Sequence, residues 1–211
     1  MTTATAVRTL SGPQVLRAKQ LKALLAAPDK RTRRGRRDSA LLAVLGCGGL
    51  RLGECCRLLV ENVEMSGDTP QSPRQRGLAP SRVRLTTRTA KSRGLRFRTI
   101  TLPGPAARLL RDHLSHSEPR LFVFEGRRHE ALSTRQAGRI VKGYLRQIGC
   151  GWAHPHTLRH SYATILIHQS HDIWLTQKQL GHASVTTTNI YAHADPSDAD
   201  RAATAIEEAM R

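Results

Sequence analysis

The stretch HPHTLRHSYATILIH, residues 154–168, brings together four histidines and one arginine. If it forms a helix that begins at Pro155, spacings of three and four residues place His156, Arg159 and His160 on one face. Such a face could bind a metal ion through imidazoles, or it could bind an anion. A phosphate suits the second chemistry, because a guanidinium offers a bidentate fork and an imidazole can exchange protons.

The neighbouring residues favour the anion over the metal. Arg159 would lie between the candidate ligands and repel a cation. The sequence contains no HExxH motif, and no cysteine lies at a ligand spacing. We therefore expect no metal here, and we expect reduced, mostly buried thiols in a cytoplasmic protein. The four cysteines are Cys47, Cys55, Cys56 and Cys150.

The composition indicates a polyanionic partner. Among 211 residues, 34 are Lys or Arg and 16 are Asp or Glu, which gives a formal net charge of +18. An excess of this size favours nucleic acid. Only 4% of the residues are aromatic, so we expect contacts to the nucleic-acid backbone rather than base stacking. No apolar run has the length of a membrane span, and the first residues lack the apolar core of a secretory signal, so no membrane partner is expected.

Helical periodicity covers most of the chain. We expect Asp38 to cap an almost wholly apolar core helix at residues 39–48, which Gly48 and Gly49 end. Another short helix is expected within residues 50–63. Apolar spacing predicts further helices at residues 13–27, 105–116, 134–149, 154–170, 172–181 and 196–210.

Two strands are predicted between these helices. Apolar and polar residues alternate over residues 82–88 and again over residues 95–102, and the segment KSRG at 91–94 has the composition of a hairpin turn. The preceding residues 66–81 are rich in Pro, Gly and Ser and are expected to form a loop. The fold class is therefore α+β, mainly helical, with a small antiparallel sheet.

Aromatic residues inside the predicted helices are expected to belong to the core. Tyr144 and Tyr162 each lie within an apolar helix stripe, and we expect Trp152 and Trp174 to act as core anchors. We expect His160 to be structural.

Two basic segments are candidate phosphate contacts. Six of the eight residues from Lys30 to Arg37 are positively charged, in what we expect to be a loop. Residues 82–98 contain seven basic residues and no acidic one. Either segment could instead be a solvated surface, but next to a polyanion each would bind phosphates. The predicted DNA-binding residues are Lys30, Arg31, Arg33, Arg34, Arg36, Arg37, Arg84, Arg88, Arg93 and Arg96.

Four short motifs occur in an order that resembles a known family. GLRLGE (49–54), HTLRH (156–160), LGH (180–182) and TTTNIYAH (186–193) together resemble the catalytic domain of tyrosine recombinases, the phage-integrase family. The resemblance covers about residues 11 to 200. It implies the catalytic residues Arg51, Lys91, His156, Arg159, His182 and Tyr191, with Glu54 as a supporting acid; Lys91 is assigned as the lysine of a β-hairpin.

The resemblance implies cleavage and rejoining of double-stranded DNA through a 3′-phosphotyrosine at Tyr191. Arg51 and Arg159 would stabilise charge on the non-bridging phosphate oxygens, and His182 would add a hydrogen bond there. His156 would accept the phenol proton or help to orient the phosphate, and Lys91 would protonate the leaving 5′ oxygen. The phosphotyrosine keeps the bond energy, so no cofactor, metal or ATP is expected.

The resemblance also implies a domain organisation. We expect an N-terminal tail at residues 1–10 and the catalytic domain at residues 11–211, without the N-terminal helical domain that members of the family usually carry. DNA binding should then be weak and salt-sensitive. A C-terminal helix at residues 195–211 could dock on a neighbouring protomer during self-association on DNA, or it could pack on its own domain.

Each motif residue also has a simpler interpretation. Arg51 could bind the carbonyls at the end of the preceding helix, His182 could interact with a helix dipole, and Tyr191 could lie in the core. Two other functions use the same features. One is DNA relaxation by the chemistry of a type IB topoisomerase, and the other is DNA binding by an accessory protein that does not recombine.

Overall fold

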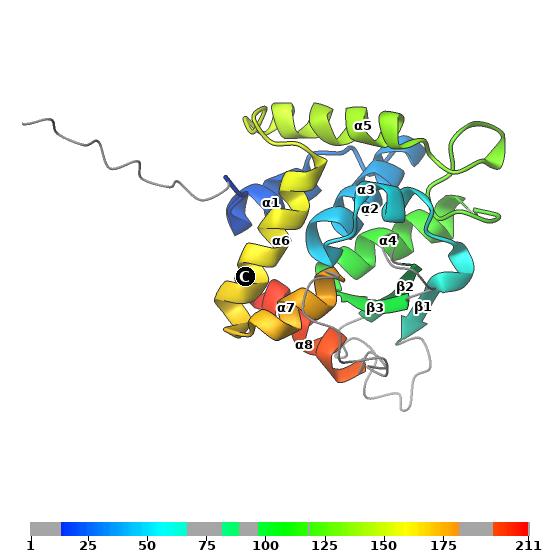
Figure 1. Ribbon diagram of the computed structural model, residues 1–211. Helices are drawn as coiled ribbons and strands as arrows, with labels where there is room; N and C mark the ends of the chain where they lie inside the picture. Colours follow the sequence, from blue (N-terminus) through cyan, green and yellow to red (C-terminus); the bar gives the residue numbers. More distant parts are fainter. Residues whose placement is uncertain (1–13, 67–81, 89–96, 118, 182–195, 211) are drawn as a thin grey trace, which may run out of the picture.

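The computed structural model describes residues 14–66, 82–88, 97–117, 119–181 and 196–210, and these residues form a mainly helical fold with one small antiparallel sheet (Figure 1). This is the predicted fold class. The helices are α1 (Ala18–Ala26), α2 (Arg33–Gly48), α3 (Leu52–Cys56), α4 (Gly104–Ser117), α5 (Thr134–Gln147), α6 (Pro155–Ser170), α7 (Ile173–Leu180) and α8 (Pro196–Ala209). The strands are β1 (Val63–Ser66), β2 (Arg82–Arg88) and β3 (Phe97–Leu102), and short 3-10 turns lie at Val60–Asn62 and Arg127–His129.

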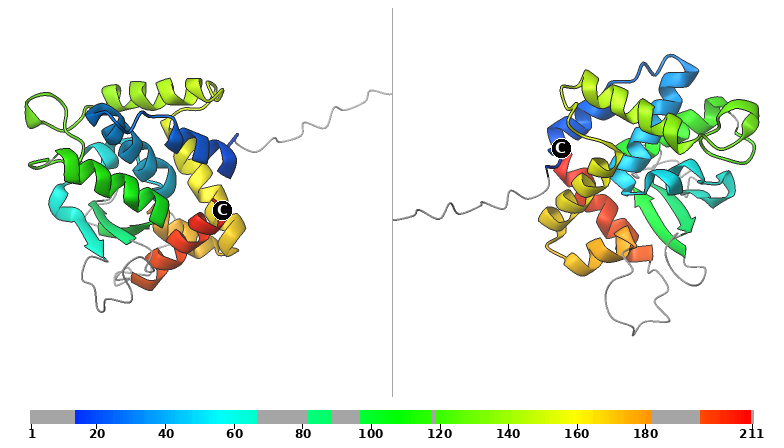
Figure 2. Two further views of the ribbon diagram at one scale, coloured as in Figure 1. Left: turned by 180° about the vertical axis from the view of Figure 1, so that it is seen from behind. Right: turned by 45° about the horizontal axis from the view of Figure 1, so that its top comes forward.

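Helix α2 is the centre of the core. Every residue from Ala40 to Leu45 is apolar and fully buried, as the sequence predicted for a helix that is apolar all round. It contacts α1, α3, α4, α6, α8 and β3. Figure 2 shows from two further sides how the other helices surround it. Helix α2 is therefore buried without interruption from Asp38 to Gly48, and only its first turn is open to solvent.

The first turn of α2 differs from the prediction. The helix begins at Arg33, inside the segment expected to be a loop, and its N-cap is Thr32, whose hydroxyl accepts a hydrogen bond from the Gly35 amide at 2.9 Å. Gly35 is required because a Cβ there would lie 1.9 Å from the Asp29 carbonyl oxygen. Asp38 does not cap a helix. It is buried within α2 and pairs with Arg37 at 2.8 Å.

The sheet has the order β1-β2-β3, with both pairs antiparallel. Leu85 lies opposite Ile100, and both side chains are fully buried towards the helices. Strand β1 was not predicted, because the sequence before it was interpreted as a helix; the structure ends α3 at Cys56 and then enters the sheet. Ser66, the first residue of the loop predicted at 66–81, is instead the last residue of β1, and the rest of that loop and the turn at 91–94 lie outside the described residues.

Helix α8 packs on its own domain. Ala202, Ala203, Ile206 and Met210 are buried, and the helix contacts α6, α7, α2 and β3 of the same chain. Of the two alternatives for this helix, docking on a neighbouring protomer or packing on its own domain, the structure has the second, and these residues are covered by the same chain. Along the described parts of the chain, no helix combines the length and apolar character needed to cross a bilayer.

The expectations for buried side chains are confirmed for the thiols and wrong for the tryptophans. All four cysteines are buried and free of disulfides. Tyr162 is 1% exposed, as expected, and Tyr144 is partly buried. Trp152 and Trp174 are not core anchors, because their side chains are 44% and 71% exposed. Trp152 lies in the turn between α5 and α6, and Trp174 lies on the solvent side of the first turn of α7.

Candidate functional site

The site is built around the turn that ends α2. Gly49 has a φ of 63°, a left-handed conformation that glycine adopts without steric cost. A Cβ at this position would lie 2.4 Å from Cδ1 of Tyr162, so α6 packs directly on the turn. The chain then reverses, and Arg51 becomes the N-cap residue of α3. The turn thus lies against the middle of α6, and Arg51 follows it by two residues.

Arg51 and Glu54 bind each other within this short helix. The Arg51 amide donates to Glu54 Oε2 at 2.9 Å, and Arg51 Nη1 donates to Glu54 Oε1 at 2.7 Å. The Glu54 side chain is 3% exposed, whereas that of Arg51 is 28% exposed. Arg51 therefore keeps access to solvent, while the buried Glu54 carboxylate fixes its orientation. This arrangement replaces the simpler interpretation in which Arg51 binds the carbonyls of α2.

Arg159 comes from α6 and points inward. We expected it on an exposed face beside His156, but it is only 3% exposed. Its Nη1 donates to the Gly49 carbonyl at 2.7 Å, and its Nη2 donates to the Leu180 carbonyl at 2.5 Å. Its long side chain reaches the ends of two helices, where backbone carbonyls lack intrahelical partners. Burial, followed by repulsion from Arg98 and Arg51, lowers the pKa of Arg159 to about 10, so it stays charged at neutral pH.

Arg98 completes the cluster and was missed by the sequence reasoning. It lies on β3, is 5% exposed, and its Nη2 donates to Glu54 Oε2 at 2.7 Å. Burial lowers its pKa, and the nearby Glu54 carboxylate opposes that shift. A signal was present in the sequence, because Arg98 has the same strand parity as Ile100 and Leu102, whose side chains face the core.

His156 lies one turn before Arg159 on α6 and remains exposed. Its ring packs edge-on against that of His160, with ring centroids 4.6 Å apart. His160, which we expected to be structural, thus contacts a residue of the site. Partial burial, followed by the charges of His160 and Arg159, lowers the pKa of His156. Its imidazole is therefore neutral at neutral pH and can accept a proton.

The structure thus gathers four of the seven predicted catalytic and supporting residues, with Arg98 added. Arg51 and Arg98 both bind Glu54. The charges of Arg51 and Arg98 help to lower the pKa of Arg159, and those of Arg159 and Arg51 help to lower the pKa of His156. Lys91, His182 and Tyr191 lie outside the described residues. Within the residues the structure describes, no group of three His, Cys, Asp or Glu side chains is placed to hold a metal ion.

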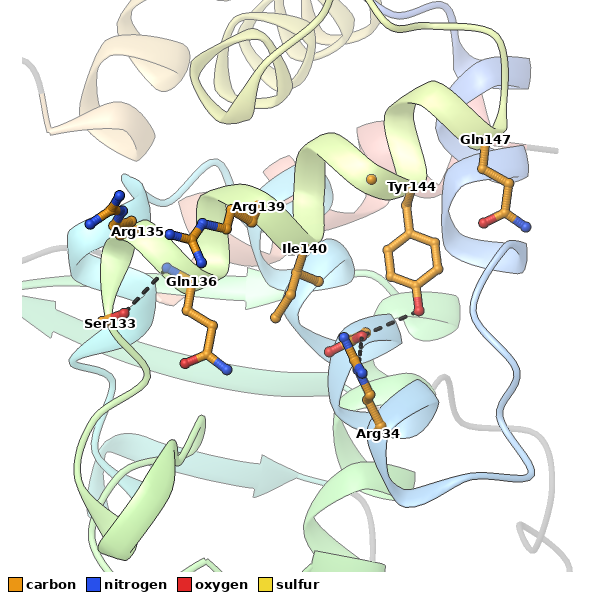
Figure 3. Close-up of a pocket in the computed structure, with 10 residues that line it drawn as sticks. Arg34, Ser133, Arg135, Gln136, Arg139, Ile140, Tyr144 and Gln147 are labelled. Carbon is orange, nitrogen blue, oxygen red and sulfur yellow. Dashed lines mark hydrogen bonds and ion pairs between the residues drawn. The ribbon is translucent and has the colours of Figure 1, made fainter.

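A cationic pocket of about 750 Å³ lies between α2 and α5 (Figure 3). Above it, α5 buries an apolar stripe and exposes a face without a single acidic side chain. In Figure 3 the side chains of Arg34 and Tyr144 approach each other beneath α5, where the Tyr144 hydroxyl donates to Asp38 Oδ2 at 3.2 Å and Arg34 forms an ion pair with the same carboxylate at 3.9 Å. The sequence reasoning missed this face, although its helical periodicity was visible. Its exposed polar residues are Arg135, Gln136, Arg139, Lys142, Arg146 and Gln147.

The predicted DNA-binding residues fall into three groups. Lys30, Arg31, Arg33 and Arg34 are exposed near the start of α2, although Arg31 pairs with Asp29, Arg33 donates to the Ser117 carbonyl and Arg34 pairs with Asp38. A second group is less exposed and is also engaged within the chain: Arg36 donates to the carbonyls of Lys30 and Arg31, Arg37 pairs with Asp38, and Arg84 pairs with Asp200 at 3.4 Å. The third group cannot be placed: Arg93 and Arg96, and the side chain of Arg88, lie outside what the structure describes.

Comparison with known proteins identifies relatives of this fold and sequence. The tyrosine recombinase XerD of Neisseria meningitidis serogroup B is 32% identical over 188 residues, which cover 86% of this chain and 58% of that relative. The chain thus spans a little over half the length of the curated relatives it matches. The crystal structure of XerA recombinase superposes with a TM-score of 0.66 at 25% identity, covering 95% of this chain and 66% of that one.

A second solved structure, XerH site-specific recombinase bound to difH substrate in a pre-cleavage complex, has a TM-score of 0.64 at 23% identity. The match covers 83% of this chain and 50% of that one. It shows the shared fold. A model of the phage integrase family matches residues 14–198, which is most of the sequence. The chain therefore belongs to the phage integrase family.

Proposed function

We propose that this chain cleaves and rejoins double-stranded DNA at specific sites, through a covalent 3′-phosphotyrosine formed by Tyr191. The observation that carries the proposal is the charge of the site. Three guanidiniums, those of Arg51, Arg98 and Arg159, surround one carboxylate, Glu54, and leave a net charge of +2. The carbonyls that accept hydrogen bonds from Arg98 and Arg159 carry no net charge, so the excess of positive charge at the site favours a bound anion.

The charge suits phosphoryl transfer. A phosphodiester carries one negative charge, and attack by a phenolate gives a five-coordinate species that carries two. Fixed donors that match the developing charge stabilise the transition state more than the ground state. Arg51 is the donor with solvent access, so it would contact the phosphate directly, and Arg159 would contact it from the floor of the site.

The remaining roles are assigned on the resemblance and the chemistry. His156, with its lowered pKa, accepts the phenol proton of Tyr191. His182 hydrogen-bonds a non-bridging oxygen. Lys91 protonates the leaving 5′ oxygen, a step that a guanidinium cannot easily perform. No step requires a metal, a nucleotide or another cofactor.

DNA would lie across the α2–α5 face. Arg135, Arg139 and Lys142 project from α5 at helical spacing, and Lys30 and Arg31 are exposed near the start of α2. Basic side chains on one face form the electrostatic footprint expected of a DNA-binding surface. The buried thiols suit a reducing compartment, and we propose that the chain acts on DNA in the cytoplasm.

Strand exchange also requires several copies. One chain carries one Tyr191, and exchange between two duplexes breaks more than one strand. We propose that copies associate on DNA through a surface other than the stripe of α8 buried here. Analytical ultracentrifugation with and without duplex tests this association, and a one-to-one complex at saturation would contradict it.

The test of the function is a suicide substrate. A duplex site is first selected from a randomised pool by binding to the wild-type chain, and a nick is then placed beside it so that the cleaved fragment diffuses away. The wild-type chain should form a covalent adduct that Tyr191→Phe does not form. Tyr162→Phe is the matched control, because it removes a hydroxyl from a buried ring, and it should keep the adduct.

An adduct that survives Tyr191→Phe would show that the nucleophile is wrong. Specific binding by the wild-type chain without any adduct would favour the accessory DNA-binding protein instead. Lys91 is tested separately. Cleavage slowed by Lys91→Ala should recover when the leaving oxygen is replaced by sulfur, which needs no acid, and a lack of recovery would assign the acid to another residue.

A further inference from the structure

Helix α7 ends with all of its last four carbonyls satisfied. An α-helix leaves these four carbonyls without intrahelical partners. The amide of Gly181, in the left-handed conformation with a φ of 61°, donates to the carbonyls of Gln177 and Lys178. The other two carbonyls bind side chains from elsewhere in the fold: that of Gln179 accepts from Arg98 Nη1, and that of Leu180 accepts from Arg159 Nη2.

These two arginines reach the helix end from different elements. Arg159 lies on α6 and also binds the Gly49 carbonyl, whereas Arg98 lies on β3 and also binds Glu54. Positive charge at a helix C-terminus is further favoured by the helix dipole. The end of α7, the turn after α2 and the start of α3 are therefore joined by two neighbouring guanidiniums.

Arg98 has no access to DNA. It is 5% exposed, and its three nitrogens donate to Glu54, to the Gln179 carbonyl and to Thr87 Oγ1 at 3.3 Å. Each of its three nitrogens therefore donates to a partner within the protein. Glu54 in turn fixes Arg51, the guanidinium that remains open to solvent.

We propose that Arg98 is a positioning residue, which holds Glu54 and thereby Arg51 on one side and fixes the C-terminal end of α7 on the other. The inference rests on the proposed function of the site. It predicts that loss of Arg98 impairs strand cleavage and leaves DNA binding intact. A displacement of about 1 Å in a positioned group can cost on the order of 10²-fold in rate.

The experiment compares Arg98→Gln, Arg98→Lys and Arg201→Gln in the full chain. Arg201 is the matched control, because its Nη2 binds Asp172 at the opposite end of α7, at 3.4 Å and on the surface. On the selected nicked duplex, Arg98→Gln should lower the single-turnover cleavage rate by about 10²-fold and change the DNA dissociation constant by less than about threefold. The cleavage rate of Arg98→Lys should lie between those of Arg98→Gln and the wild type, and the cleavage rate of Arg201→Gln should match that of the wild type.

Hydrogen exchange without DNA gives a second readout. Amides of residues 177–181 should exchange at least about tenfold faster in Arg98→Gln than in the wild type or Arg201→Gln. The reason is that the end of α7 loses the hydrogen bond from Arg98 to the Gln179 carbonyl. A folded Arg98→Gln with a wild-type cleavage rate, or with its loss confined to DNA affinity, would overturn the proposal. Unchanged exchange at 177–181 would also overturn it.

Two further comparisons keep the test decisive. Should Arg98→Gln fail to fold, Arg98→Lys carries the same comparison, because an ammonium cannot bind Glu54 and the Gln179 carbonyl in the same planar fork. The double variant Arg98→Gln/Glu54→Gln should lose little more cleavage than Arg98→Gln alone, since both act through Arg51. Absence of cleavage in the wild type would count against the proposed function, whereas the exchange result would still decide whether Arg98 positions α7.

Discussion

Gly49 should be among the positions of this fold least tolerant of a side chain. Substitution Gly49→Ala introduces a Cβ at a φ of 63° and at 2.4 Å from the ring of Tyr162. The left-handed conformation costs about 1–2 kcal/mol for a residue other than glycine. Relief of the clash requires a shift of a fully packed tyrosine or of the turn, which typically costs about 1–3 kcal/mol.

The two costs add to about 2–5 kcal/mol of lost free energy of unfolding. For a domain of this size each kcal/mol corresponds to about 2–4 °C in Tm, so we expect a Tm lower by about 4–20 °C. Urea and thermal unfolding, followed by circular dichroism, measure the effect. The same shift would move the Gly49 carbonyl away from Arg159, so cleavage should fall more steeply than the folded fraction.

Gly143→Ala is the matched control on α5. A Cβ there would meet nothing within 4 Å, and replacing glycine by alanine within a helix should stabilise the fold by about 0.5–1 kcal/mol. Stability changes of opposite sign at two glycines are therefore expected. A cost below about 1 kcal/mol for Gly49→Ala would refute the reasoning, because it would mean that the turn and Tyr162 adapt freely.

Three further perturbations test the site. His160→Gln should raise the pKa of His156 towards its ordinary value, because it removes the His160 charge that lowers that pKa. The acid limb of the pH profile of cleavage should then move to higher pH. NMR titration of the His156 ring measures the shift directly. Arg159→Lys should slow adduct formation by about 10²–10³-fold with little change in DNA affinity. The reason is that an ammonium cannot bind the Gly49 and Leu180 carbonyls in one fork. A wild-type rate of adduct formation would contradict this role. Arg139→Gln should weaken DNA binding and reduce the slope of log affinity against log salt by about one, and an unchanged slope would remove this residue from the interface.

The periodicity of the sequence was enough to predict most elements. The apolar stripe of α6 and the glycine at the end of α7 both fall where the pattern placed them. The start of α2 was predicted wrongly, because a run of arginines is also compatible with a helix once Thr32 supplies the cap. Strand β1 has only four residues, and it was missed because helical periodicity was extended through residues 50–63; its pairing with β2 is what defines it as a strand.

The depth of the charged side chains was not predictable from spacing. Helical positions show that His156 and Arg159 share a region of α6, but one is exposed and the other is 3% exposed. What decides the difference is the presence of two carbonyls, of Gly49 and Leu180, which only the tertiary fold brings within reach of a guanidinium. A buried arginine is stable where such acceptors meet it, and spacing within one helix cannot show them.

The carbonyls of Leu180 and Gly49 also explain why three motifs that are separate in the sequence, LGH, HTLRH and GLRLGE, belong together. In LGH, Gly181 provides the left-handed residue that ends α7, and the residue before it, Leu180, presents the carbonyl that Arg159 of HTLRH binds. In GLRLGE, Gly49 provides the other left-handed turn and the other carbonyl. Arg159 thus joins the two glycine turns, and Arg98 joins their neighbours Glu54 and Gln179 in the same way. Substitutions at either turn and at the arginine that binds it should therefore be non-additive, with the double variant of Gly49→Ala and Arg159→Lys losing less cleavage than the product of the two single losses.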